Sequence, residues 1–166
     1  YPAAPDCHKN FQVLCEASAR LEKEIGVGKF SVVLTIDGNE NRYTRWLKKQ
    51  WGHVQSLSFV GFLSRERLYG YYQESDCLIF PSKIETWGLP ISEFKSFNRP
   101  ILASDLPYAQ GAAGGATKVS FFDPNDPERL KDMMLRLING LNSIEAETIE
   151  EPVAYNWKEL FDYLLA

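Results

Sequence analysis

The sequence predicts an α/β fold, with a parallel sheet covered by helices on both faces. Segments with the apolar, β-branched character of buried strands alternate along the chain with segments of helical periodicity. Strands separated by helices pair in parallel, because each helix returns the chain to the same edge of the sheet. The 166 residues suffice for one such domain with its own core.

The first half of the chain is predicted to hold two helices and two strands. Apolar residues recur at helical spacing over residues 11–25, and we expect Asp6 to cap this helix and Gly26 to end it. The segment at 30–36 is rich in β-branched residues and is followed by an Asp-Gly-Asn turn, which indicates a strand. The remaining elements of this half are a helix over 43–51 and a short strand over 57–60.

The second half continues the same alternation. Ser64 is placed to cap one helix, and Asp126 to cap another that begins at Pro127. The other expected elements, in order, are a strand over 77–80, a helix over 90–97, a strand over 101–103, a flexible Gly/Ala-rich loop over 110–116 and a strand over 118–122. The buried stripe predicted for the helix after Pro127 consists of Leu130, Met133, Met134, Leu137, Ile138 and Leu141.

These elements place one domain at residues 1–141. Residues 142–155 are acidic and weakly patterned, so we interpret them as a linking segment. Asn156 and Glu159 have the spacing of a capping box, which predicts a last helix over 156–166. The chain begins with Tyr1 rather than methionine, which is typical of a fragment of a longer protein.

The bulk properties argue against several classes of function. A formal net charge of −4 without a basic run disfavours nucleic-acid binding. No apolar stretch is long enough to span a bilayer, and no signal-peptide pattern is found. Cys7, Cys15 and Cys77 lack the spacing of a metal or redox motif, so three free thiols in a reducing cytosol are expected. His8 and His53 are not spaced as zinc ligands either.

The most informative stretch is residues 81–93, which read P-S-K-I-E-T-W-G-L-P-I-S-E. It follows an apolar strand, breaks in the middle and restarts as a helix with Pro90 near its first position. Glu85 and Glu93 stand eight residues apart, one in the loop and the other in the first turn of the helix. Free backbone N–H groups flanked by two carboxylates suit an anionic ligand that carries hydroxyl groups, such as a sugar nucleotide.

This stretch resembles the donor-site motif of retaining nucleotide-sugar glycosyltransferases of the group 1 type, which have the two-domain GT-B architecture. The resemblance rests on E-x7-E after P-S, with G-L-P inside it and R-P-I-L-A-S behind it. Further matching segments follow the family's order along residues 8–141, which makes the resemblance specific. They are H-K-N at 8–10, V-G-F at 60–62, S-D at 75–76, S-D-L-P at 104–107 and F-D-P-N-D-P at 122–127.

The resemblance implies a Rossmann-like parallel sheet that is one half of a GT-B enzyme, namely the C-terminal domain that binds the donor. The family's first strand precedes the first helix, so only residues 1–4 remain to form it, and we expect that strand to be short or truncated. In such enzymes an N-terminal domain builds most of the acceptor side. The chain alone is therefore expected to bind nucleotide without turnover.

The resemblance also implies roles for the site residues. Glu93 matches the residue that accepts hydrogen bonds from the ribose hydroxyls, and Glu85 matches the catalytic position near the transferred sugar. Lys9 matches the lysine that neutralises the leaving diphosphate. The arginine that the family often carries shortly before this lysine is absent, so diphosphate binding is weaker, is shared with another residue, or is completed by Lys83 or the other domain. The remaining expected donor contacts are Gly61 and Phe62 at the base, Gly88 and Leu89 at the phosphates, and Thr86 and Trp87 between the two glutamates.

The implied reaction is transfer of a sugar, of the hexosyl type, from a nucleoside diphosphate sugar to a glycan or glycolipid acceptor, as in polysaccharide biosynthesis. No cofactor is expected. No metal is expected either, because the chain lacks the D-x-D sequence with which sugar transferases of the other common architecture hold a cation. The expected partners are the nucleotide-sugar, the acceptor and the N-terminal domain. The expected location is the cytoplasm, with membrane contact only through the missing part.

Two alternatives remain open. Another GT-B-type enzyme, such as a sugar-nucleotide epimerase, would release free sugar or epimer without an acceptor. A glycan phosphorylase belongs to the same group, but the lysine context for pyridoxal phosphate is not found. The second alternative is a non-catalytic nucleotide-binding module, which would keep binding through Glu93 and show no transfer even beside the N-terminal domain.

Overall fold

The elements follow the predicted alternation of strands and helices. The computed structural model describes residues 1–140, so the predicted linking segment at 142–155 and the last helix at 156–166 lie outside the described residues, as does Leu141. The helices are η1 (Cys7–Lys9), α1 (Phe11–Ile25), α2 (Arg42–Trp51), α3 (Arg65–Glu74), α4 (Leu89–Phe94), η2 (Lys95–Phe97), α5 (Pro107–Ala112) and α6 (Pro127–Ile138). The strands are β1 (Val32–Leu34), β2 (Leu57–Phe59), β3 (Leu78–Phe80), β4 (Ile101–Ser104) and β5 (Val119–Phe122).

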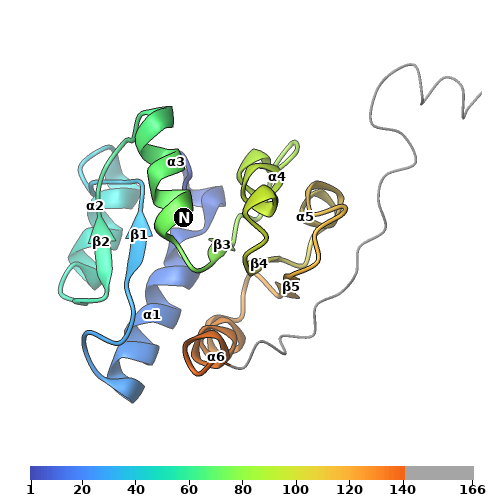
Figure 1. Ribbon diagram of the computed structural model, residues 1–166. Helices are drawn as coiled ribbons and strands as arrows, with labels where there is room; N and C mark the ends of the chain where they lie inside the picture. Colours follow the sequence, from blue (N-terminus) through green and yellow to red (C-terminus); the bar gives the residue numbers. More distant parts are fainter. Residues whose placement is uncertain (141–166) are drawn as a thin grey trace, which may run out of the picture.

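The strands form two parallel sheets that stand side by side (Figure 1). β1 pairs with β2, and the other sheet has the order β3-β4-β5. In the larger sheet Leu78 lies opposite Ile101, and Ile101 lies opposite Val119. The predicted α/β class and the parallel pairing are confirmed, although most strands are shorter than the sequence pattern indicated.

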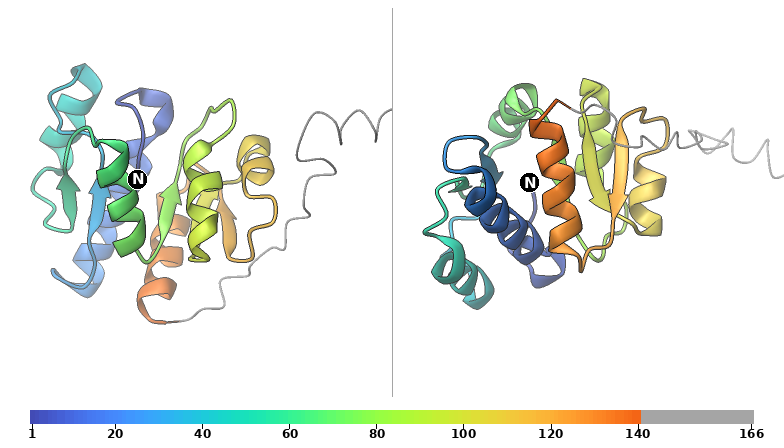
Figure 2. Two further views of the ribbon diagram at one scale, coloured as in Figure 1. Left: turned by 45° about the horizontal axis from the view of Figure 1, so that its top comes forward. Right: turned by 90° about the horizontal axis from the view of Figure 1, so that it is seen from below.

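Helices cover both faces of the three-stranded sheet, because successive residues of a strand point to opposite sides. Leu102 of β4 packs in a buried cluster with Leu14 of α1 and Met133 of α6. Its neighbour Ile101 packs in a second cluster, with Phe94 of α4 and residues of α5. Figure 2 accordingly shows α6 on one side of β4 and β5, and α5 on the other.

The first residues of the chain lie beside β1, between the two sheets. The amine of Tyr1 donates to the carbonyl oxygen of Val33 at 2.6 Å, and the backbone N–H of Ala3 donates to Oγ1 of Thr35 at 2.9 Å. This segment is extended but is not part of either sheet, so the predicted first strand is present only as a short stretch of hydrogen bonds. A cavity of about 770 Å³ adjoins Tyr1, with walls that include Val33 and Cys77.

Three predicted helix ends are confirmed. Gly26 ends α1 with a φ of 89°, a backbone conformation that favours glycine. Ser64 caps α3 by accepting a hydrogen bond from the N–H of Arg67 at 3.4 Å. Asp126 caps α6 in the same way, from the N–H of Arg129 at 2.8 Å. Ser64 and Asp126 thereby satisfy backbone donors that have no partner inside the helix.

Two local predictions are wrong. Asp6 does not cap α1, because the 3-10 helix η1 intervenes and Asn10, with a φ of 57°, takes the cap position instead. The Gly/Ala-rich loop expected at 110–116 is partly helical, since α5 runs through Gly111 to Ala112. Pro107 at the start of α5 and the alanines after it favour a helix, and they outweigh the glycine.

Two helices differ in detail from their predicted patterns. The motif helix expected at 90–97 is divided into α4 and the 3-10 helix η2. The stripe predicted for α6 is buried at Leu130, Met133 and Met134, whereas Ile138 is 39% exposed because it is the last residue of the helix.

Candidate functional site

The candidate site lies at the carboxyl end of β3, where the chain leaves the sheet toward α4. The loop after β3 is fixed to the segment before α1: the backbone N–H of Lys83 donates to the carbonyl oxygen of His8 at 2.8 Å. Buried Asn10 joins a third segment, because its side-chain amide donates to the carbonyl oxygens of Pro81 at 3.0 Å and Pro124 at 2.7 Å. Parallel sheets of this kind bind ligands at this edge.

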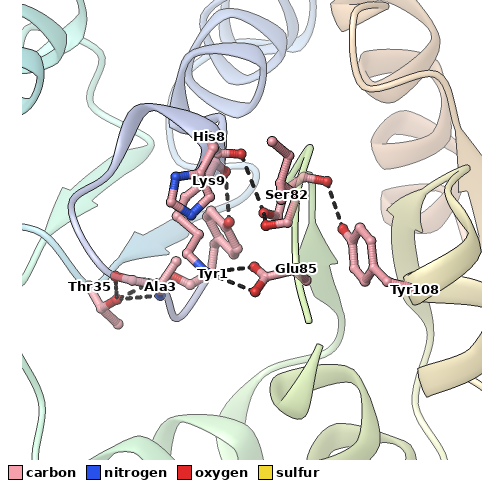
Figure 3. A network of polar contacts seen from close by, with 9 residues as sticks. Tyr1, Ala3, His8, Lys9, Thr35, Ser82, Glu85 and Tyr108 are labelled. Carbon is pink, nitrogen blue, oxygen red and sulfur yellow. Dashed lines mark hydrogen bonds and ion pairs between the residues drawn. The ribbon is translucent and has the colours of Figure 1, made fainter. Parts of the chain in front are cut away.

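Lys9 and Glu85 meet at the centre of this arrangement (Figure 3). The ammonium of Lys9 donates to both carboxylate oxygens of Glu85, at 2.7 and 2.8 Å. The two side chains are only 17% and 12% exposed, so the pair is largely withdrawn from water. Charges with little access to water interact more strongly than surface pairs, and each depends on its partner.

Two tyrosine hydroxyls hold the backbone around this ion pair (Figure 3). Tyr1 donates to the carbonyl oxygen of Lys9 at 2.7 Å, and Tyr108 donates to the carbonyl oxygen of Ser82 at 2.6 Å. Burial raises the pKa of both hydroxyls well above the ordinary value, with the negative charge of Glu85 contributing further. Both tyrosines therefore stay neutral hydrogen-bond donors.

Gly88 and Trp87 form the turn into α4. Gly88 has a φ of 87°, and an added Cβ would lie 3.3 Å from the ring of Tyr108 and 3.4 Å from Ala112. Trp87 is 53% exposed, while its indole N–H donates to the hydroxyl of Ser92 at 3.1 Å. The turn thus combines a backbone that only glycine adopts readily with an aromatic side chain held at the surface.

Glu93 lies farther along α4 than the sequence pattern indicated. It is the fifth residue of a helix that starts at Leu89, so its placement in the first turn was wrong. Its carboxylate accepts a hydrogen bond from the hydroxyl of Tyr72 on α3 at 3.2 Å. Tyr72 is 3% exposed, and burial, followed by the charge of Glu93, raises its pKa well above the ordinary value.

The predicted base-contacting residues lie after β2. Gly61 has a φ of 75° and is buried, and Phe62 beside it is 92% exposed. Thr86 and Leu89 are also exposed. Within residues 1–140 no hydrogen bond or ring contact joins Phe62 to Lys9 or to either motif glutamate, so the structure brings Lys9 and Glu85 together without joining the base-side residues to them.

Four supporting residues were missed as site residues by the sequence reasoning. They are Asn10, Tyr72, Ser82 and Tyr108. Asn10 was noted only as part of the H-K-N segment, and Tyr72 was given no role in the site. A polar residue inside a matching motif was an available signal for Asn10 and Ser82. No local pattern marks Tyr72 or Tyr108, because their partners lie 21 and 26 residues away along the chain.

Residues 1–140 contain no group of three or more His, Cys, Asp or Glu side chains arranged to hold a metal ion. Helices long and apolar enough to cross a membrane are likewise not found in this part of the chain. The three cysteines, Cys7, Cys15 and Cys77, are free thiols, as the sequence predicted. The expectation that the reaction needs no metal or cofactor stays a prediction.

Known proteins resemble this chain in part of its sequence and in its fold. Residues 4–140 match the sequence pattern of the family described as "Glycosyl transferases group 1". D-inositol 3-phosphate glycosyltransferase 1 from Catenulispora acidiphila is 26% identical over 102 residues, which make up 60% of this chain and 24% of that relative. The match thus spans about a quarter of that enzyme's length.

Two solved structures show the same fold. Sucrose-phosphate synthase from Thermosynechococcus elongatus has a TM-score of 0.69 and 22% identity, covering 99% of this chain and 43% of that one. The C-terminal domain of a glycosyl transferase group 1 family protein from Francisella tularensis has a TM-score of 0.64 and 19% identity, covering 86% of this chain and 76% of that one. With its Rossmann-like GT-B domain and the family match over most of its length, the chain belongs to the glycosyl transferases group 1 family.

Proposed function

We propose that the protein is the donor-binding domain of a retaining glycosyltransferase, which moves a sugar from a nucleoside diphosphate sugar to a glycan or glycolipid acceptor. Family membership supports the transfer of a glycosyl group. The observation that carries the finer proposal is the ion pair of Lys9 and Glu85, which joins a cation and a carboxylate 76 residues apart at the carboxyl end of β3. The cation suits a diphosphate, and the carboxylate suits a sugar hydroxyl.

In this proposal Lys9 offsets the negative charge that builds on the leaving diphosphate. Glu85 faces the transferred sugar, where its carboxylate accepts a hydrogen bond from a sugar hydroxyl or stabilises positive charge at the anomeric carbon. Glu93 accepts hydrogen bonds from the ribose hydroxyls, and Tyr72 holds its carboxylate in place. Lys83 is the second cation near the phosphates; its ammonium now donates to Oδ1 of Asn125 at 2.6 Å.

Residues of the two loops after β2 and β3 form the remaining donor contacts in the proposal. The backbone at Gly61 and the ring of Phe62 face the base, and Gly88 and Leu89 approach the phosphates. Thr86 and Trp87 complete the surface between the two glutamates. The side chains of Phe62, Leu89 and Trp87 are 92%, 64% and 53% exposed, so each is accessible to a ligand.

The proposed partners are the nucleotide-sugar, an acceptor and an N-terminal domain of the same enzyme. The acceptor binds mainly to an N-terminal domain of the same enzyme, so the chain alone binds nucleotide without turnover. The diphosphate is held by Lys9 and backbone groups without a metal ion. The proposed location is the cytoplasm, with peripheral membrane contact through the rest of the enzyme and a role in polysaccharide biosynthesis.

The test is calorimetric titration of the chain with UDP, GDP and ADP, with and without EDTA. We expect one nucleotide to bind in both conditions, and Lys9→Met to weaken that binding. Binding that needs a divalent cation would contradict the metal-independent site. Sugar transfer is then assayed with the full-length enzyme and an acceptor; release of free sugar or epimer without an acceptor would favour the epimerase alternative instead.

A further inference from the structure

The ion pair of Lys9 and Glu85 occupies, in the ligand-free protein, both groups that the donor is proposed to use. One ammonium takes both carboxylate oxygens, at 2.7 and 2.8 Å. The lysine and glutamate side chains are 17% and 12% exposed, so water replaces the lost contacts poorly when the pair opens. A ligand that draws Lys9 away must therefore compensate Glu85 as well.

Within residues 1–140 Glu85 has no second donor to fall back on. The two hydrogen bonds from Lys9 are the ones that its carboxylate accepts there. Lys83, two residues earlier, donates instead to Oδ1 of Asn125 at 2.6 Å. A carboxylate that is only 12% exposed and loses the cation that it binds within residues 1–140 is left without hydrogen bonds there, which is more costly than a surface charge losing a partner.

The backbones on both sides of the pair are held in place, so the pair opens by side-chain rotation. The carbonyl oxygen of His8 accepts from the N–H of Lys83 at 2.8 Å and from the hydroxyl of Ser82 at 3.3 Å. The carbonyl oxygen of Lys9 accepts from the hydroxyl of Tyr1 at 2.7 Å. Lys9 can therefore turn to a phosphate without moving the backbone.

We propose that this pair makes the site select a nucleoside diphosphate that carries its sugar over the bare nucleoside diphosphate; the inference rests on the function proposed above. A sugar nucleotide takes Lys9 with its phosphate and offers sugar hydroxyls to Glu85, so both charges keep partners. A bare diphosphate takes Lys9 and leaves Glu85 unpaired. The reaction product is thereby bound more weakly than the substrate, which favours its release.

The test compares Glu85→Gln with the parent chain, using UDP against UDP-glucose, GDP against GDP-mannose and ADP against ADP-glucose in calorimetry. The neutral amide no longer holds Lys9 by charge, so the bare diphosphate of the preferred pair should bind about tenfold more tightly, a change of about 1.4 kcal/mol. The sugar nucleotide should change by less than about threefold, because the gain at Lys9 and the loss at the sugar hydroxyl offset each other.

Two further variants make the test specific. Adding Lys9→Met to Glu85→Gln should remove the gain for the bare diphosphate, since the gain comes from the freed ammonium. Glu24→Gln is the matched control: it takes a carboxylate from the pair with Lys131, whose ammonium lies 2.8 Å away, at the far end of α1. This control should leave the preference of the site unchanged. Melting curves of the ligand-free variants verify that each is folded.

The outcomes separate the two proposals. If the parent binds nucleotides and Glu85→Gln leaves the ratio of the two affinities as it was, the inference is wrong and the proposed function stands. The inference also fails if the gain survives the loss of Lys9. If no nucleotide of either kind binds the parent, the proposed function fails and takes this inference with it.

Discussion

At the level of single residues, the two motif glutamates differ in how the fold holds them. Glu85 is bound by the charge of Lys9, whereas Glu93 is bound by the neutral hydroxyl of Tyr72. Burial and the charge of Glu93 raise the pKa of Tyr72, so it does not lose its proton near neutral pH. Glu93 thus has a neutral hydrogen-bond donor as its direct partner, whereas Glu85 has a cation.

Glu93→Gln should weaken the binding of the preferred nucleoside diphosphate, because an amide replaces the charged acceptor proposed for the ribose hydroxyls. The expected loss is about 1.5–3 kcal/mol, the usual contribution of a hydrogen bond to a charged group. Calorimetry measures it, with Glu66→Gln on the exposed surface of α3 as the control. Equal affinities for Glu93→Gln and the parent would remove Glu93 from the site.

Tyr72→Phe should weaken nucleotide binding less, by about 0.5–1.5 kcal/mol, because it removes a neutral donor that only orients Glu93. Binding of inorganic pyrophosphate should stay the same, since the variant does not touch Lys9 or the loop after β3. Tyr69→Phe is the matched control, because Tyr69 packs against the ring of Tyr72 at 5.5 Å without contacting Glu93 by a hydrogen bond. A loss of pyrophosphate binding in Tyr72→Phe would indicate a structural rather than an orienting role.

At the level of elements, the site depends on the close approach of α4 to α5. Gly88 opens α4 with a φ of 87° against Tyr108 and Ala112 of α5, and the hydroxyl of Tyr108 in turn holds the loop after β3. Gly88 therefore sets the direction of α4 and also lets α5 pack closely against the start of α4. α5 itself contains Gly111, whose Cβ position meets nothing within 4 Å.

The two glycines should respond to alanine with opposite signs. Gly88→Ala should lower the free energy of unfolding by about 1–2 kcal/mol, because a left-handed residue with a Cβ is strained. Gly111→Ala should raise it by about 0.5–1 kcal/mol, since alanine is the better residue inside a helix and the space is open. Urea unfolding followed by circular dichroism measures both.

The alanine pair also tests the correction made to the predicted loop at 110–116. If this segment were irregular, Gly111→Ala would not gain from helix propensity. A Gly111→Ala variant that is less stable than the parent would therefore argue against α5 as the structure has it.

At the level of the whole molecule, Tyr1 connects the two halves of the core. Its ring lies 4.8 Å from that of Phe11 and 5.4 Å from that of Phe80, measured between centroids, and it packs against both buried clusters. In the 166-residue chain taken by itself, a free amine at Tyr1 lies beside β1, where burial lowers its pKa from 8.0 to about 5. The positive charge is unfavourable in this position, so in that chain a free amine is neutral at pH 7.

Stability of the 166-residue chain should therefore rise between pH 5 and pH 8. In this window the unfolded chain still binds a proton at the amine and the folded chain does not, so raising the pH favours the folded state. The full gain in the free energy of unfolding is about 4 kcal/mol, from a shift of about three pKa units at about 1.4 kcal/mol each. Denaturant titrations at several pH values measure it.

The matched control is the same chain acetylated at Tyr1. The amide cannot titrate, so the difference in pH dependence between the two chains isolates the amine from every carboxyl and histidine. Parallel pH profiles for the two chains would show that the amine is solvated rather than buried.

Much of the architecture follows from local patterns in the sequence. Examples are the helical periodicity over 11–25, the caps Ser64 and Asp126 and the order of the strands. Each depends on residues a few positions apart, whose distance in space is fixed by the local backbone geometry. The group 1 motif at 81–93 likewise identified the loop after β3 and the start of α4. Local patterns failed where two signals competed, as at α5, where helix formers outweighed Gly111.

Only the tertiary structure decided which side chains meet. Lys9 reaches Glu85 and Tyr72 reaches Glu93 across 76 and 21 residues, after separate elements have packed. Spacing along the chain says nothing of such pairs, because burial and charge act through space. The sequence by itself therefore determined the family and the α/β class and proposed the two candidate carboxylates; packing determined that one of them is held by a largely buried ammonium and the other by a neutral tyrosine.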